Sequence, residues 1–201
     1  MHGVRMELLD AQAKSIGIPL HKVMVPEGPT MEEYDRLMRQ VMRSFHMEGV
    51  AASIYGDIFL EDLRRYREER LAEVGMQGLF PLWKRNTCEL VREFIDKGFQ
   101  AVIVCVNEKY LDGSFVGRML DASFLNDIPP TVDPCGENGE YHSFVFDGPI
   151  FSTPVRWRYG VKVRRKYEPS TSRVCDSPSI ETDDAFWYCD LIPHIIGEKH
   201  G

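Results

Sequence analysis

The sequence predicts an α/β fold in which a mostly parallel sheet is flanked by helices. Residues 50–55 form a compact apolar stretch with the composition of a strand, and the strand expected at residues 100–106 contains a continuously apolar run, 101–106, as expected for a strand buried on both faces. Around them lie segments whose apolar residues recur at helical spacing, so that strand and helix alternate along the chain. A chain of 201 residues with 43% hydrophobic residues can form a buried core, and it fits one domain or one domain with an appendage.

The predicted helices begin and end at recognisable signals. Thr30 and Glu33 match a capping box, in which each side chain satisfies a free amide at the start of a helix. The helix that begins there is expected to end at Gly49. Further elements are expected as helices at residues 4–16, 60–74 and 87–97 and as short strands at residues 20–25 and 79–82.

The pattern changes after residue 151. Residues 154–167 alternate like the two arms of a hairpin around Gly160, and residues 186–192 are typical of a returning strand. Residues 168–184 have the Ser-, Pro-, Thr- and Asp-rich composition of a loop. The sequence therefore predicts a small antiparallel β appendage at the C-terminal end of the chain.

Composition and charge argue against several classes of protein. A net charge of -7 disfavours a nucleic-acid partner, and the Arg- and Glu-rich residues 60–74 are expected to be a solvated helix face. No apolar run has the length of a membrane span, and no signal-peptide profile is visible. The five cysteines are widely spaced without a C-x-x-C, which indicates neither a disulfide framework nor a metal site. Reduced cysteines in a cytoplasmic protein are the simplest account.

Residues 133–147 carry the densest set of candidate functional residues. Gly136 and Gly139 each stand directly before a carboxylate, Glu137 and Glu140, and a strand-like pattern follows. Glycines let a backbone approach a ligand closely, and carboxylates beside them can hold an amine or accept a proton. A solvated acidic turn before a strand is the competing interpretation, and composition alone favours it.

Four other positions carry a functional and a structural interpretation. His142, at the start of that strand, is an ordinary hydrogen-bonded histidine unless it faces the two glutamates. Gly56 and Asp57 follow an apolar strand and so lie at the edge where open sheets bind ligands, although Asp57 also suits a helix N-cap. Arg118 lies in a loop of small residues, where it could clamp a carboxylate or phosphate or form a surface salt bridge.

The segment Gly136-Glu-Asn-Gly-Glu-Tyr-His-Ser-Phe144 resembles the signature of the diphthine–ammonia ligase family. That family belongs to the PP-loop ATP pyrophosphatases, or adenine nucleotide α-hydrolase-like proteins. Three further segments match the family in the same order: Tyr55-Gly-Asp-Ile58, Leu79-Phe-Pro-Leu-Trp83 and Leu111-Asp-Gly-Ser-Phe-Val-Gly-Arg118. The resemblance runs from about residue 1 to about residue 151, and four motifs in order make it specific.

The resemblance implies an ATP-dependent amide ligase, an acid–ammonia C–N ligase in which a carboxylate is adenylated and ammonia then displaces AMP. It implies ATP and Mg²⁺ as cofactors. The implied partners are ammonia and a carboxylate substrate, which is either a diphthine-bearing elongation factor or a small metabolite. No nucleic acid or membrane partner is implied, and a homodimer is one expected arrangement.

The resemblance also assigns regions and residues. Residues 1–106 correspond to a partial PP-loop, HUP-like ATP-binding domain, residues 107–151 to the substrate and ammonia part, and residues 152–201 to the β appendage. The assigned residues are Gly56 and Asp57 for the nucleotide, Glu137 and Glu140 for catalysis, and Gly136, Gly139, Arg118 and His142 for the substrate.

The chain departs from the family in lacking S-G-G-x-D-S, whose backbone amides hold pyrophosphate. Its first residues resemble a point inside the family domain. A truncated gene model, a fragment completed by another chain and a degenerate protein are the expected explanations, and an exposed sheet edge would favour dimers. Two hypotheses follow: a ligase that is inactive alone because the nucleotide loop is missing, or a non-catalytic binding module derived from the family.

Overall fold

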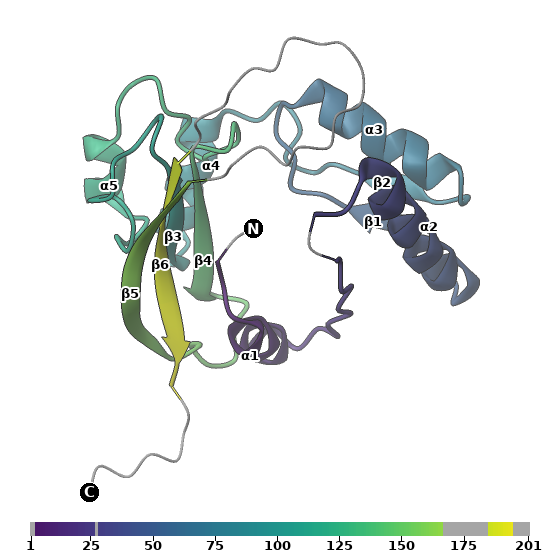
Figure 1. The fold of residues 1–201 in the computed structure, drawn as a ribbon, viewed down its shortest axis with the longest axis horizontal. Coiled ribbons are helices and arrows are strands. Elements are labelled where there is room, and N and C mark those ends of the chain that lie inside the picture. The colour runs from purple at the N-terminus through teal and green to yellow at the C-terminus, as the bar shows by residue number, and fades with distance from the viewer. Residues whose placement is uncertain (1–2, 27, 167–184, 195–201) are drawn as a thin grey trace, which may run out of the picture. The chain divides into compact units, whose positions relative to one another are not determined.

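The computed structural model describes residues 3–26, 28–166 and 185–194, and the chain divides into two compact units. Unit 1 combines Met1–Leu20 with Thr87–Gly201, and unit 2 is His21–Asn86. Unit 2 contains a small parallel sheet and unit 1 a four-stranded antiparallel sheet, each with helices (Figure 1). The predicted α/β class is therefore confirmed.

Unit 2 is a short strand–helix–strand arrangement preceded by a long helix. Its elements are α2 (Met31–Met47), β1 (Ala52–Ile54), α3 (Glu61–Ala72) and β2 (Gln77–Leu79). β1 and β2 pair in parallel, with Ala52 opposite Gln77 and Ile54 opposite Leu79. A small core of Leu71, Val74 and Met76 lies beneath them, with Met42 and Tyr55 packed against it.

The capping box predicted at the start of α2 is confirmed. Thr30 Oγ1 accepts a hydrogen bond from the Glu33 amide at 3.1 Å, and Glu33 Oε2 accepts one from the Thr30 amide at 2.9 Å. This capping box begins α2, which ends two residues before Gly49.

The strands predicted at residues 20–25 and 79–82 are wrong: the first is absent, and the second lies earlier in the chain. Residues 20–25 form no strand and belong to neither sheet, and Leu20, Met24 and Val25 are exposed. The second strand is β2, which ends where residues 79–82 were expected to begin a strand. Pro81 has no amide for a sheet ladder, and the chain turns there, with the Trp83 amide donating to the Phe80 carbonyl at 3.1 Å.

Unit 1 is built on one antiparallel sheet with three helices. The strands are β3 (Gln100–Asn107), β4 (Tyr141–Asp147), β5 (Trp157–Lys166) and β6 (Ala185–Pro193), and the helices are α1 (Met6–Ile16), α4 (Thr87–Asp96) and α5 (Ala122–Asp127). The strand order is β4-β3-β6-β5, which Figure 1 shows side by side.

The predicted mostly parallel sheet is wrong for unit 1. Residues 101–106 of β3 are all buried, as expected for a strand covered on both faces, but β3 pairs antiparallel with both β4 and β6. Leu8 of α1, Val91 of α4 and Phe124 of α5 belong to the same buried core as β3. A continuously apolar sequence therefore indicates a strand that is buried on both faces, but it does not indicate whether the neighbouring strands are parallel or antiparallel.

The C-terminal strands are antiparallel, as predicted, but they complete the main sheet. The strand expected at residues 186–192 is confirmed as β6, which pairs with β3 at Cys105 and Tyr188. The hairpin expected around Gly160 is wrong, because Gly160 lies inside β5 at a register shift between Tyr159 and Lys162. A Cβ atom at Gly160 would lie 2.7 Å from Asp190 Oδ2, so a larger residue there would displace the Asp190 side chain.

The loop expected at residues 168–184 lies outside the described residues. The division into functional parts at residues 106 and 151 stays a prediction. Over the described ranges, no helix combines the length and the apolar composition needed to span a bilayer.

Candidate functional site

The glycine-rich loop before β4 is organised by a buried carboxylate. Glu140 is 1% exposed, and its Oε1 accepts hydrogen bonds from the Asp133 amide at 2.9 Å and from Asn138 Nδ2 at 3.0 Å. Its Oε2 accepts the Asn138 amide at 3.0 Å. Glu140 therefore joins the two ends of the loop, which we call the 133–140 loop.

A second carboxylate completes the hydrogen bonds inside the 133–140 loop. Asp133 Oδ2 accepts the amides of Cys135 at 3.1 Å and Glu137 at 3.0 Å. The Tyr141 hydroxyl donates to the Pro134 carbonyl at 2.5 Å. Burial raises the pKa of the Cys135 thiol to about 12, with help from the Asp133 and Glu137 charges, so this thiol is protonated at neutral pH.

Both glycines of this loop have left-handed backbone angles, but they differ in their surroundings. Gly136 has φ +69°, and a Cβ atom there would lie 2.9 Å from the Tyr141 carbonyl oxygen. Gly139 has φ +82° with open space around its missing Cβ. Gly136 therefore lets the loop pack on β4, whereas Gly139 serves the turn alone.

The two predicted catalytic glutamates have different environments. The Glu140 carboxylate is used by the loop itself, a structural task that the sequence analysis did not assign to it. Glu137 is half-buried, and its amide is held in the loop by Asp133. Their catalytic roles stay predictions, and Glu137 is the one whose side chain is more accessible.

Arg118 forms the salt bridge that was its structural alternative. Its Nη2 donates to Asp127 Oδ2 at 2.6 Å and to Ser123 Oγ at 3.2 Å, both on α5. Its guanidinium lies 5.7 Å from the ring centroid of Phe124, which packs edge-on against Tyr141 at 5.2 Å. Phe124 thus connects Arg118 to Tyr141, the residue that follows the 133–140 loop.

His142 is placed by the β4–β3 ladder. It is half-buried and lies opposite Cys105 in the register of the two strands. Its predicted role in substrate binding stays a prediction.

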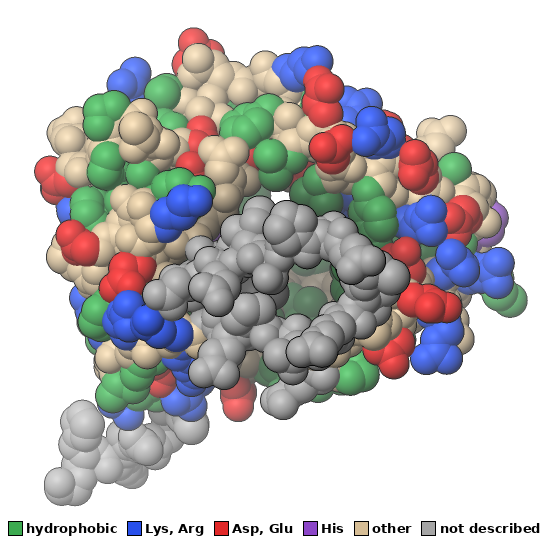
Figure 2. Space-filling view, turned by 45° about the horizontal axis from the view of Figure 1, so that its top comes forward, with side chains coloured by type: hydrophobic (Ala, Val, Ile, Leu, Met, Phe, Trp, Pro, Cys, Tyr) green, Lys and Arg blue, Asp and Glu red, His purple; other side chains and the backbone are tan. Residues whose placement is uncertain are grey.

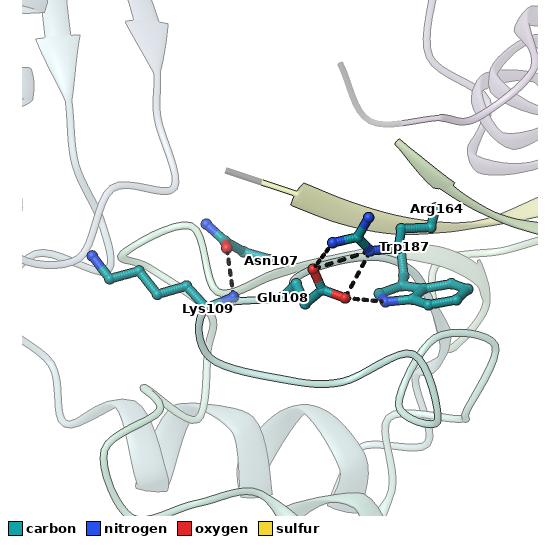
Figure 3. A network of polar contacts seen from close by, with 5 residues as sticks. All are labelled: Asn107, Glu108, Lys109, Arg164 and Trp187. Carbon is teal, nitrogen blue, oxygen red and sulfur yellow. Dashed lines mark hydrogen bonds and ion pairs between the residues drawn. The ribbon is translucent and has the colours of Figure 1, made fainter. Parts of the chain in front are cut away.

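A polar network next to the 133–140 loop was not predicted. The Asn107 amide donates to the Glu140 carbonyl at 2.8 Å, and the Glu108 amide donates to the Ala185 carbonyl at 2.8 Å. The Glu108 carboxylate accepts from Arg164 Nε at 2.8 Å and from Trp187 Nε1 at 3.1 Å (Figure 3). Asn107 and Glu108 therefore connect the 133–140 loop, β5 and β6, and sequence reasoning missed them because their partners are distant in the chain.

The same network holds the loop that carries Arg118. The Trp187 indole packs over Gly113, where a Cβ atom would lie 2.7 Å from Trp187 Cδ2. This contact explains the glycine in the family-like segment that begins at Leu111.

The ion pair between Glu108 and Arg164 makes a pH-dependent prediction. Hydrogen bonding to Arg164 holds the pKa of Glu108 below its ordinary value. The ion pair therefore stabilises the folded state fully above the unfolded pKa of about 4.3, and this stabilisation is lost as pH falls through the lower pKa that Glu108 has in the folded state. Denaturant titrations should show Glu108→Gln to be less stable than wild type at pH 7, with the difference shrinking below about pH 4.

The matched control for this titration is Asp96→Asn, a change at an exposed carboxylate of α4. A stability difference for Glu108→Gln that stays constant over the whole pH range would contradict the ion-pair account.

In unit 2, the predicted nucleotide-binding residues lie at the carboxyl end of β1. Asp57 is 9% exposed and pairs with Arg67, with 2.7 Å from Arg67 Nε to Asp57 Oδ2 and 3.2 Å from Nη2 to Oδ1. Arg67 also lies 4.3 Å over the Tyr55 ring. The cap of α3 is Leu60, without a side-chain hydrogen bond, so Asp57 does not have the N-cap role that was its alternative.

The arginines of α3 are not only a solvated face, which corrects that expectation. Arg64 lies 4.8 Å from the Phe80 ring and 4.6 Å from the Trp83 ring. With Arg67 on Tyr55, α3 therefore connects the two family-like segments of unit 2. On the face that Figure 2 shows, Lys and Arg side chains are interspersed with Asp and Glu.

A cavity of about 60 Å³ lies between α2 and α3, too small for a nucleotide base. Tyr66 donates a hydrogen bond to Asp35 there, and burial followed by that contact raises the pKa of Tyr66 to about 12. The lining residues are Tyr34, Asp35, Met38, Arg39, Met42, Tyr55, Tyr66, Arg67, Arg70 and Leu71.

The eight candidate residues are thus divided between the units. Gly56 and Asp57 lie in unit 2, and Arg118, His142 and the four candidates of the 133–140 loop lie in unit 1. A single site that contains both groups stays a prediction.

These features define the class of the protein: a two-unit α/β chain with a carboxylate-anchored glycine loop. The family model of the diphthamide synthase N-terminal domain matches residues 1–78, and that of the diphthamide synthase C-terminal domain matches residues 86–175. The chain belongs to the diphthamide synthase family, which confirms the resemblance found in the sequence.

Curated relatives agree with this membership. A protein named diphthine–ammonia ligase from Homo sapiens is 28% identical over 166 residues, covering 73% of this chain and 61% of the relative. Its namesake from Danio rerio is 26% identical over 171 residues, covering 74% of this chain and 64% of the relative. The chain therefore spans a little over three fifths of the length of these relatives.

Proposed function

We propose that this chain takes part in the ATP-dependent joining of a carboxylate to ammonia. Membership of the diphthamide synthase family carries this proposal, together with the name of the curated relatives. The geometry that supports it is the 133–140 loop, in which buried Glu140 and Asp133 fix the backbone that presents Glu137.

In this proposal Glu137 acts on the ammonia. A carboxylate can hold ammonium and accept a proton as the amine attacks an activated acid. Glu140 keeps the loop in shape, and Gly136 and Gly139 allow its turns. Arg118 and His142 border the loop as substrate-binding residues.

Gly56 and Asp57 are the proposed nucleotide-binding residues. Gly56 has open space at the position of its missing Cβ, so a ligand can approach its backbone. Asp57 is fixed by Arg67, although neither Asp57 Oδ2 nor Arg67 Nε has an aligned hydrogen bond at their 2.7 Å separation. ATP would supply the activation of the carboxylate.

Mg²⁺ enters the proposal only as the counter-ion of the phosphates. The described residues contain no group of three or more His, Cys, Asp or Glu that could hold a metal ion, so none is assigned to it.

The test is formation of AMP and pyrophosphate from ATP, dependent on ammonium and on a carboxylate. Two arms supply a diphthine-bearing elongation factor and a panel of small carboxylates. When the S-G-G-x-D-S segment is supplied by a full-length form or by a completing chain, turnover with either arm is expected, and Glu137→Gln should lower it at least about 100-fold without a change in stability. Asp96→Asn is the matched control.

The alternative is the non-catalytic binding module. Absence of turnover in both arms, with ATP binding that is weakened by Asp57→Asn, would favour that module over the ligase.

A further inference from the structure

Positive charge is concentrated on one strand of an acidic chain. Residues 148–166 contain no Asp or Glu, and the chain carries a net charge of -7. The six basic residues of this stretch are Arg156, Arg158, Lys162, Arg164, Arg165 and Lys166. Without these six charges the rest of the chain would carry -13, so the asymmetry is large enough to attract a partner of opposite charge.

These residues lie on or beside β5, which is an edge strand. β5 pairs with β6 on one side, and no strand lies beyond it in the part of the chain that the structure describes. The opposite edge, β4, is covered: Gln12 Nε2 donates to the Val145 carbonyl at 2.5 Å, and the Val155 amide donates to the Phe146 carbonyl at 2.8 Å. The two edges therefore differ in both charge and cover.

Basic side chains flank β5 on both faces of the sheet. Arg158 lies opposite Ile192 and Arg165 opposite Phe186, while Lys162 lies opposite Cys189. Residues directly opposite each other on neighbouring strands lie on the same face of the sheet. Ile192 and Phe186 are six positions apart on β6 and share a face, whereas Cys189 is three positions from each and lies on the opposite face. Arg158 and Arg165 are therefore on one face and Lys162 on the other, and all three are exposed.

We propose that β5 is a docking edge for an acidic, extended segment of a partner protein. Such a segment adds to an edge strand through main-chain hydrogen bonds, and its alternating side chains meet residues on both faces. Acidic side chains would meet Arg158, Lys162 and Arg165 there. A second copy of this chain does not suit the edge, because β5 pairing with β5 would set like charges against each other.

The proposal concerns peptide binding at the β5 edge and no step of the ligase reaction, so it can be tested without ATP, although Lys162 lies beside Gly117, the neighbour of Arg118. The probe is a fluorescent peptide of about ten residues, the length of a strand, in which pairs of Glu alternate with pairs of Thr so that acidic side chains lie on both faces. Its binding is measured by fluorescence anisotropy at low and moderate salt. A triple variant, Arg158→Glu with Lys162→Glu and Arg165→Glu, should weaken binding more than tenfold, which corresponds to about 1.4 kcal/mol.

The control carries the same charge change elsewhere: Lys14→Glu with Arg36→Glu and Arg43→Glu, all at exposed positions. It should bind the peptide within about twofold of wild type, and circular dichroism checks the fold of both variants. A peptide N-methylated at alternate residues cannot form the ladder and should not bind.

Three results would overturn the proposal. In the first, the N-methylated peptide binds as tightly as the unmodified peptide. In the second, a single-stranded oligonucleotide of the same charge binds as tightly as the peptide. In the third, the peptide does not bind at all. The last result would leave the charges with the protective role that lysine and arginine commonly have on edge strands.

Discussion

Replacing Glu140 by glutamine is expected to destabilise unit 1 by about 3 kcal/mol. The buried carboxylate accepts three hydrogen bonds, and glutamine would turn an NH₂ group toward either the Asn138 amide or the Asp133 amide. Hydrogen bonds to charged groups contribute about 1.5–3 kcal/mol each, and a buried donor without an acceptor adds its desolvation cost. Urea titration followed by circular dichroism gives the change in the free energy of unfolding.

The matched change is Glu137→Gln, three residues earlier in the same loop. Its side chain is half-buried, whereas that of Glu140 is fully buried, and the Glu137 amide, which the substitution keeps, donates to Asp133. A change below about 0.5 kcal/mol is expected. Equal destabilisation by the two substitutions would show that Glu140 has no special role in the loop.

Replacing Gly136 by alanine is expected to cost about 3 kcal/mol, while Gly139→Ala should cost only about 1–2 kcal/mol. Both residues have positive φ angles, so both substitutions carry the strain of the left-handed region. At Gly136 the new Cβ would also lie 2.9 Å from the Tyr141 carbonyl oxygen and 3.1 Å from the Tyr141 ring, so the loop would have to move away from β4.

Thermal unfolding of the two glycine variants measures this difference directly. Hydrogen exchange at the Asp133 and Asn138 amides then tests its cause, because a displaced loop would expose both groups. If Gly139→Ala proved the more destabilising change, the close packing of Gly136 on Tyr141 would not be what holds the loop.

The sequence predicted the features that depend on near neighbours. The capping box at Thr30 needs only residues three apart, and the buried strand at residues 100–106 needs only its own composition. The direction of the neighbouring strands could not be read in the same way. Cys105 pairs with Tyr188, 83 residues later, and the period of an apolar run is the same for parallel and antiparallel neighbours.

The candidate site shows the same limit at the level of single side chains. The spacing of Glu137 and Glu140 singled out the 133–140 loop as a candidate site, and that role stays a prediction. The spacing could not tell that Glu140 points into the loop, because that depends on where Asp133 and Asn138 place their donors. Gly160 was taken for a turn because a glycine in an alternating stretch is equally typical of a hairpin and of a bulge.

The division into two units also separates the natural fluorophores of the chain. Of its three tryptophans, Trp83 lies in unit 2, and Trp157 and Trp187 lie in unit 1. Fluorine-labelled tryptophan would therefore give separate NMR resonances for unit 1 and unit 2. If all three native resonances disappear at the same temperature on heating, the chain unfolds in one cooperative transition. If the Trp83 resonance disappears at a different temperature from those of Trp157 and Trp187, each unit has its own melting temperature.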